Sequence, residues 1–207
     1  MALTKRTGDY GEYWGNDYNS STALTKAQMK VNATYIYASL SASGWTLNAI
    51  CGMLGNMQTE SSINPGRWQS NRVEGDPSGH GYGLVQWTPY TKYTNWARDR
   101  GYDPSTMDSN LDRINYEVDN HLQWISTSQY PMTFEEFKNS TDSPYTLGLA
   151  FLRNYERPAN PNQAVRGKQA EYWYRYLSGV IPPGPDKEKK NHYKFVLFNR
   201  RRRLRNG

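Results

Sequence analysis

The sequence has little cysteine and no long apolar run. Cys51 is the one cysteine among 207 residues, so an intrachain disulfide is excluded. No apolar stretch approaches the ~20 residues that span a bilayer, and residues 1–20 contain no apolar core of a signal peptide. We therefore expect no membrane insertion and no export signal.

Potential metal ligands are scarce as well. His80, His121 and His192 are isolated from one another, and the sequence contains neither a His-Glu-x-x-His motif nor a pair of cysteines. A zinc-dependent peptidase therefore lacks its ligands, and we expect neither a metal nor another cofactor. Cys51 lies within an apolar helical pattern, which favours core packing over a role as a nucleophile.

Positive charge is concentrated at the carboxyl end. Residues 186–207 hold nine Lys or Arg and two acidic residues, a net charge of +7, whereas the whole chain carries +6; the first 185 residues therefore carry about −1. The main domain should not be interpreted as a nucleic-acid-binding domain on its overall charge. The cluster Arg200, Arg201, Arg202 and Arg203 could bind an anionic polymer such as teichoic acid or DNA, or could be a solvated end.

The pattern of apolar residues, glycines and prolines predicts one main domain of α+β class, mainly helical. Residues 1–24 are polar and aperiodic, which indicates a flexible arm, and residues 180–207 read as a Pro/Gly linker followed by the basic tail. The glycine-rich residues 64–89 predict a small β-hairpin inserted between helices. Helices are expected at 25–43, where Thr25 and Gln28 form a capping box, and at 46–60, 93–100, 107–126, 134–139, 143–157 and 163–177.

The second expected helix ends on a carboxylate. Leu47, Ile50, Cys51, Leu54 and Met57 recur at helical spacing, and Glu60 lies three residues further on at the edge of this stripe. Partial burial and the negative end of the helix dipole both disfavour an ionised carboxylate. Glu60 is therefore a candidate general acid, although a surface glutamate near a helix end would show the same pattern.

Gly52 and Gly55 lie on one face of the same helix. Each glycine costs about 1 kcal/mol relative to alanine in a helix interior. The pair therefore predicts that another backbone approaches this face closely.

A second motif follows Glu60-Ser61 about two dozen residues later. The segment Gly83-Leu84-Val85-Gln86 provides a Gly-Leu-x-Gln motif, and further segments at 50–57, 155–163 and 169–174 accompany it. In these features residues 25–179 resemble lysozyme-like muramidases and lytic transglycosylases, and most closely the phage tail-tip lysozymes, including tail-knob lysins of phages that infect Gram-positive bacteria. The combination is far more specific than any one segment.

The resemblance implies a lysozyme-like fold in which the glycine-rich hairpin borders a cleft. It also implies cleavage of the β-1,4 bond between N-acetylmuramic acid and N-acetylglucosamine in peptidoglycan, with Glu60 as the general acid. Gln86 would face the cleft and bind an N-acetyl group or a water. Four aromatic rings could stack on sugars, although each could equally be core packing: Tyr82, Trp87, Trp68 and Tyr155.

A simple hydrolase usually has a second carboxylate. Asp76 is our choice for a water-activating base, Glu74 is an alternative in the same segment, and Glu156 beside Arg157 is interpreted as a structural ion pair. Related families also work with one acid, through substrate assistance or by forming an anhydro product. A lytic transglycosylase with the same acid therefore stays an alternative, as does a non-catalytic wall-binding virion protein.

The resemblance further implies a place in the phage tail tip, in contact with other tail proteins, where the enzyme would open the cell wall during entry. An expected lack of an export signal fits this location, because the particle itself would carry the protein to the next host.

Overall fold

The computed structural model describes residues 3–71 and 79–180. The helices are α1 (Lys26–Ala42), α2 (Leu47–Ser61), α3 (Thr91–Arg98), α4 (Met107–Asp119), α5 (Phe134–Asn139), α6 (Pro144–Phe151) and α7 (Ala164–Val180), with a short 3-10 helix η1 (Gln69–Asn71) and a π-helix η2 (Leu152–Glu156). Strands β1 (Thr4–Gly8) and β2 (Gly11–Gly15) form an antiparallel hairpin. The α+β, mainly helical class is confirmed.

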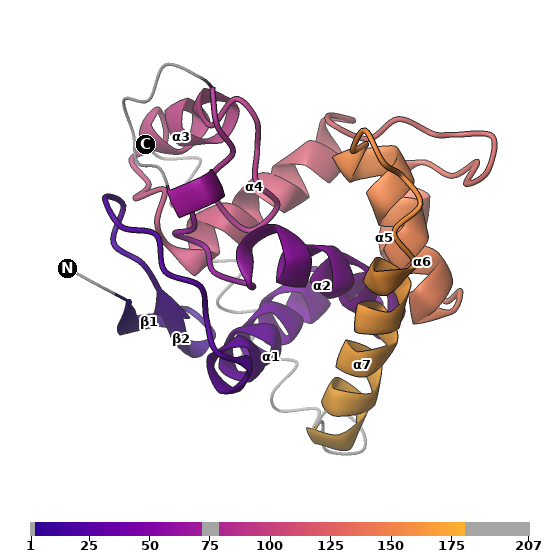
Figure 1. Ribbon diagram of the computed structural model, residues 1–207, viewed down its shortest axis with the longest axis horizontal. Helices are drawn as coiled ribbons and strands as arrows, with labels where there is room; N and C mark the ends of the chain where they lie inside the picture. Colours follow the sequence, from indigo (N-terminus) through magenta and orange to yellow (C-terminus); the bar gives the residue numbers. More distant parts are fainter. Residues whose placement is uncertain (1–2, 72–78, 181–207) are drawn as a thin grey trace.

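Helix α2 lies in the middle of the molecule, with α6 and α7 on one side and the hairpin on the other (Figure 1). The side chains of Ile50, Cys51, Leu54 and Met57 are fully buried, as their spacing predicts. The Thr46 hydroxyl accepts a hydrogen bond from the amide of Ala49 and caps the amino end. Helix α2 is therefore the central element of the core.

The two glycines of α2 allow α6 and α7 to pack closely, which confirms the expectation from the sequence. A Cβ on Gly52 would lie 2.9 Å from the carbonyl carbon of Leu147 in α6. A Cβ on Gly55 would lie 2.4 Å from the carbonyl oxygen of Arg166 and 2.8 Å from the amide nitrogen of Ala170, both in α7. These glycines fix the spacing of the three helices.

The extended arm predicted for residues 1–24 was wrong for its described part. Residues 4–15 form the β1–β2 hairpin, and buried Asn32 on α1 joins it to the core: its Oδ1 accepts from the amide of Trp14, and its Nδ2 donates to the carbonyls of Trp14 and Ile63 at 2.7 and 2.8 Å. The hairpin is held by side-chain amides as well as by buried Tyr13. Its apolar alternation was too short to be detected.

The glycine-rich hairpin predicted within residues 64–89 was also misplaced. In its described part, only isolated bridges join Trp68 with Tyr82 and Tyr82 with Trp87. The residues between Tyr82 and Trp87 form a tight turn in which Gly83 has φ +88° and Gln86 has φ +51°. A Cβ on Gly83 would lie 2.7 Å from Oδ1 of Asn110. The glycine thus serves a turn rather than a strand.

The remaining helices follow the predicted ranges with two differences. Helix α4 stops at Asp119, seven residues before its predicted end, and His121 and Gln123 then adopt left-handed backbone angles. The helix predicted at 143–157 changes into η2 after Phe151. Arg157 ends it with φ +49°. This change of helix type determines where Glu156 lies.

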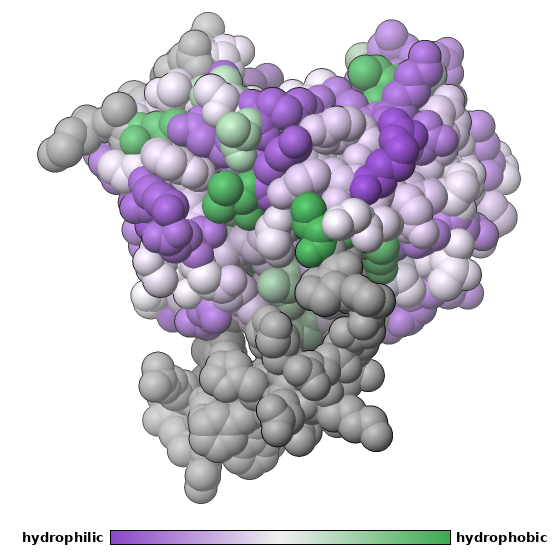
Figure 2. Space-filling model, turned by 90° about the horizontal axis from the view of Figure 1, so that it is seen from below, coloured by the Kyte–Doolittle hydropathy of each residue, from purple (hydrophilic) through white to green (hydrophobic). Residues whose placement is uncertain are grey.

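The surface of the described residues is mostly hydrophilic. On the face shown in Figure 2, hydrophobic residues occur in small separate groups. Few large hydrophobic side chains are exposed among the described residues: Leu122, Ile125, Val165, Tyr174 and Val180. Within residues 3–71 and 79–180, no helix combines the length and apolar character needed to cross a membrane.

Candidate active site

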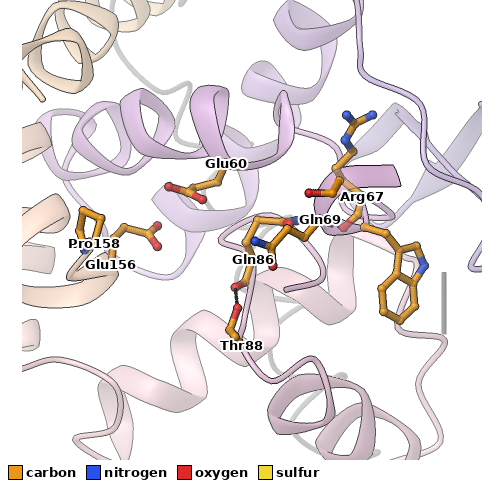
Figure 3. A pocket seen from close by; sticks show the side chains of 9 residues that line it. Glu60, Arg67, Gln69, Gln86, Thr88, Glu156 and Pro158 are labelled. Atoms are coloured by element: carbon orange, nitrogen blue, oxygen red, sulfur yellow. Dashed lines mark hydrogen bonds between the residues drawn. The ribbon is translucent and has the colours of Figure 1, made fainter. Parts of the chain in front are cut away.

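A polar pocket of about 260 Å³ opens beside the carboxyl end of α2. Two carboxylates line one side, Glu60 from α2 and Glu156 from the end of η2 (Figure 3). The opposite side is a loop surface that includes Gln86 and Thr88. The full lining is Glu60, Arg67, Trp68, Gln69, Ser70, Gln86, Thr88, Glu156 and Pro158.

Ser61 connects the end of α2 to the turn that carries Gln86. Its hydroxyl donates to the carbonyl of Leu84 at 2.8 Å and lies 3.1 Å from the carbonyl of Met57. Ser62 then ends the helix with a left-handed backbone. The Glu60-Ser61 pair and the Gly83–Gln86 segment, which the sequence analysis associated as motifs, are therefore in direct contact.

Glu60 is partly buried, as its position at the edge of the apolar stripe predicted, with 23% of its side chain exposed. Arg166 on α7 donates from Nη2 to its Oε1 at 2.7 Å. The same guanidinium donates to the carbonyl of Asn56 and to Oε1 of Gln163, each at 2.9 Å, and its side chain is 5% exposed. Such a charge-assisted contact holds Glu60 in one orientation.

The sequence analysis missed Arg166, although a signal was available. Arg166 precedes Ala170, Trp173 and Leu177 at helical spacing, and all four side chains are buried in α7. An arginine in register with an apolar stripe is rarely buried without a partner. This pattern could have predicted an acidic partner for Arg166 on the facing helix.

Glu156 does not form the ion pair with Arg157 that the sequence suggested. Arg157 instead donates from Nη1 to the carbonyls of Gln123 and Asn154. The Oε1 atom of Glu156 is shielded from solvent and has no hydrogen-bond partner among the described residues. Burial raises the pKa of Glu156 well above its usual range, and the negative charge of nearby Glu60 raises it further.

Gln86 lies in the pocket lining, on a turn rather than on the predicted strand. Its Nε2 donates to the carbonyls of Arg67 and Gly83 at 3.0 and 2.8 Å, so its amide orientation is defined. Its Oε1 is buried without a partner. A shielded acceptor without a partner is uncommon in proteins, and this one belongs to a residue of the pocket lining.

The four aromatic candidates for sugar stacking are core residues. Tyr82 is 0% exposed and lies between other rings, with the Trp68 ring centroid at 4.4 Å. Trp87 and Tyr155 are 3% and 1% exposed, and both donate to the buried carboxylate of Glu117, Nε1 of Trp87 at 2.9 Å and the Tyr155 hydroxyl at 2.5 Å. Trp68 contributes to the pocket lining but is only 1% exposed. No ring face of these residues is open to a sugar.

Several candidates cannot be placed. Asp76 and Glu74 lie outside the described residues, as do the linker after Val180 and the cluster Arg200 to Arg203. Within the described residues, no group of three His, Cys, Asp or Glu side chains could hold a metal ion. Cys51 is buried in the core, and burial raises the pKa of its thiol. The expectation that Cys51 is a packing residue is thereby confirmed.

Comparison with known proteins places the chain among phage proteins. The model of the phage tail lysozyme family matches residues 31–177. The chain belongs to the phage tail lysozyme family. The chain is 57% identical over 162 residues to "Morphogenesis protein 1" of Bacillus phage B103, an alignment that covers 78% of the chain and 43% of that relative. The chain thus matches less than half the length of the relative, and the family match confirms the resemblance seen in the sequence.

Proposed function

We propose that this protein is a peptidoglycan glycosidase in which Glu60 is the general acid. The observation that carries the proposal is the position of the Glu60 carboxylate: it faces a polar pocket, and Ser61 ties its helix to the Gln86 turn. Membership of the phage tail lysozyme family supports a glycan substrate. The bond cleaved is the β-1,4 linkage from N-acetylmuramic acid to N-acetylglucosamine.

The pocket offers contacts for such a substrate. Proton donation to the glycosidic oxygen requires an acid within hydrogen-bond reach of that oxygen. Glu60 lines the pocket, so a glycan strand bound there would pass beside its carboxyl group. Gln86 also lines the pocket, and its unpartnered Oε1 can accept from the N–H of an acetamido group once the side chain turns toward the substrate, because this oxygen is shielded from solvent. The polar residues Gln69, Ser70 and Thr88, which also line the pocket, can form hydrogen bonds with sugar hydroxyls.

The second carboxylate and the type of product belong to the same proposal. Asp76 stays our hypothesis for a water-activating base, and an anhydro product formed without a base is the alternative. Mass spectrometry of the released muropeptides distinguishes the two. Anhydromuramic ends would indicate a lytic transglycosylase, whereas reducing ends would indicate a muramidase.

The proposed place of action is the virion. The curated relative is a phage morphogenesis protein, and we propose that this chain is likewise a tail component that opens the cell wall on entry, in contact with other tail proteins. Antibody labelling of purified particles, combined with a zymogram of their proteins, tests the location. Particles that lack the protein would contradict it.

Substitution Glu60→Gln tests the assignment of the acid. It keeps the shape of the side chain and its contact with Arg166 but removes the transferable proton, so we expect wall-clearing activity to fall about 100- to 10,000-fold. Turbidity loss of purified Gram-positive walls measures the effect. Glu171→Gln, the same change at an exposed position of α7, is the matched control and should leave activity unchanged. Near-normal activity of folded Glu60→Gln would mean that Glu60 is not the acid. Binding to walls without turnover in the unmodified protein would favour the non-catalytic alternative.

A further inference from the structure

Glu60 and Glu156 lie on the same side of the pocket, and their environments differ. The two carboxyl groups point toward one another (Figure 3). Arg166 donates to Glu60 at 2.7 Å, whereas Oε1 of Glu156 is buried and accepts from no described residue. Arg166 therefore contacts only one of the two neighbouring carboxyl groups.

Glu156 as a whole is half-buried, but its shielded Oε1 has no donor. Ionisation of a carboxyl group with such an oxygen is costly, and the cost falls when the group carries a proton. Two interacting carboxyl groups lose their protons in steps that belong to the pair. Because Arg166 contacts Glu60 and no described donor contacts Oε1 of Glu156, the proton of the pair belongs on Glu156.

We propose that Glu60 and Glu156 share a single proton, which Glu156 holds in the resting protein and which reaches the substrate through Glu60. This inference rests on the proposed glycosidase function and assigns Glu156 a role that its motif did not suggest. The chemistry is that of carboxylate pairs in which one partner stays protonated at neutral pH because both cannot ionise together.

The proton balance of the step is complete. A proton passes from Glu156 to Glu60, directly or through one water, and then to the glycosidic oxygen as the bond from C1 to that oxygen breaks. In hydrolysis the water that adds to C1 releases one proton, and in transglycosylation the substrate hydroxyl that closes the anhydro ring does so. That proton returns to the pair, so the protein is unchanged after one turnover.

Four charged groups act on Glu156 and set its titration. Glu60 on α2 and Glu117 on α4 favour its protonated form, whereas Arg166 on α7 and Arg157 at the end of its own helix favour ionisation. Desolvation is the largest influence and also favours the protonated form. The pKa of Glu156 is therefore raised in the folded protein. Protonation of Glu156 then contributes to the free energy of unfolding. This contribution is fully present below the ordinary pKa of glutamate and is lost as pH rises through the raised pKa of the folded protein.

Glutamate titration by carbon NMR on the full chain tests the shared proton without any substrate. The unmodified protein should show a late-titrating glutamate that disappears in Glu156→Gln. In Glu60→Gln the titration of Glu156 should move to lower pH, because the neighbouring negative charge is gone. If no titration is lost in Glu156→Gln, or if Glu60→Gln leaves the titration of Glu156 unchanged, the inference is overturned.

Unfolding in urea provides a second measurement that is independent of activity. One extra proton held by the folded state changes the unfolding equilibrium constant up to about tenfold per pH unit. Within the window between the ordinary and the raised pKa, the unmodified protein should lose stability as pH rises, and Glu156→Gln should lose less. Glu117 is also buried with a raised pKa, but it is retained in both proteins, so the difference isolates Glu156. An identical pH dependence of the two proteins would contradict the inference.

Wall-clearing rates as a function of pH separate the inference from the proposed function. Glu156→Gln should reduce activity about 100-fold or more at neutral pH and move the alkaline limb of the profile to lower pH. Full activity of Glu156→Gln with an unchanged profile, alongside inactive Glu60→Gln, would overturn the shared proton and leave the glycosidase assignment intact. Active Glu60→Gln would instead overturn the assignment of Glu60 as the acid, and the titration would still decide whether the pair shares a proton.

Discussion

The two sides of the pocket are built on different physical principles. The helical side, formed by α2, η2 and α7, positions Glu60 and Glu156 through close helix packing and the buried Arg166 contact. The loop side, formed by residues 67–70 and 86–88, positions Gln86 through left-handed backbone angles and hydrogen bonds to carbonyls. The first side places charges that can transfer a proton, and the second places neutral acceptors that can recognise a ligand.

Of the changes that test this division of the pocket, removal of the buried Arg166 guanidinium should lower stability most. Arg166→Gln leaves Glu60 without its partner and the carbonyl of Asn56 without its donor, so we expect a loss of about 3 kcal/mol in the free energy of unfolding, toward the lower end for a broken buried pair because Glu60 is partly open to the pocket. Urea denaturation measures it. Lys168→Gln, at an exposed position of the same helix, should be within about 0.5 kcal/mol of the unmodified protein. Equal values for both variants would show that the helical side does not depend on the ion pair.

Forcing α2 and α7 apart should lower stability by the next largest amount. Gly55→Ala would place a Cβ 2.4 Å from the carbonyl oxygen of Arg166, and backbone cannot move aside as a flexible side chain can. We expect a cost of about 2 kcal/mol from overpacking and a fall in activity, since α7 carries the partner of Glu60. Gly179→Ala, where a Cβ would meet nothing within 4 Å, is the control and should be neutral or slightly stabilising. Differential scanning calorimetry with a wall-clearing assay measures both effects.

The smallest effect is expected on the loop side. Gln86→Leu removes two hydrogen bonds to the carbonyls of Arg67 and Gly83, at a cost of about 1 kcal/mol because neutral hydrogen bonds contribute little net stability. The pH dependence of activity should stay unchanged, because Gln86 carries no proton for the reaction. Weaker binding of chitin oligosaccharides, measured by calorimetry, is the expected functional result. An altered pH profile would show that the two sides of the pocket are not separable in this way.

The same division explains what the sequence could predict. Helix α2, its cap at Thr46 and its two glycines were predictable because spacing of three and four residues reports a buried helical face. The turn at Gln86 was not predictable, because glutamine has no local preference for left-handed backbone angles. Contacts with distant residues, such as the hydrogen bond from Gln86 to the carbonyl of Arg67, accompany this conformation.

The acidic pair was only half predictable. Glu60 lies on a periodic stripe, whereas Glu156 depends on a local change from α- to π-helix at Leu152, for which hydrophobic spacing carries no signal. The aromatic candidates were misassigned because tyrosine and tryptophan suit either a core or a sugar surface. In this protein the polar ends of Trp87 and Tyr155 are satisfied internally by Glu117.

The amino-terminal hairpin has a practical consequence for work on the isolated protein. Asn32 bonds both to Trp14 in the hairpin and to Ile63, two residues after Ser61, and the amide of Asn16 donates to Asn64. A shortened protein that begins at Thr25 would leave Asn32 without Trp14 and Asn64 without Asn16, beside the end of α2. Weak activity of such a protein would then reflect the loss of hydrogen bonds next to the end of α2, where Glu60 lies. The activity of the shortened protein would not measure that of the intact chain.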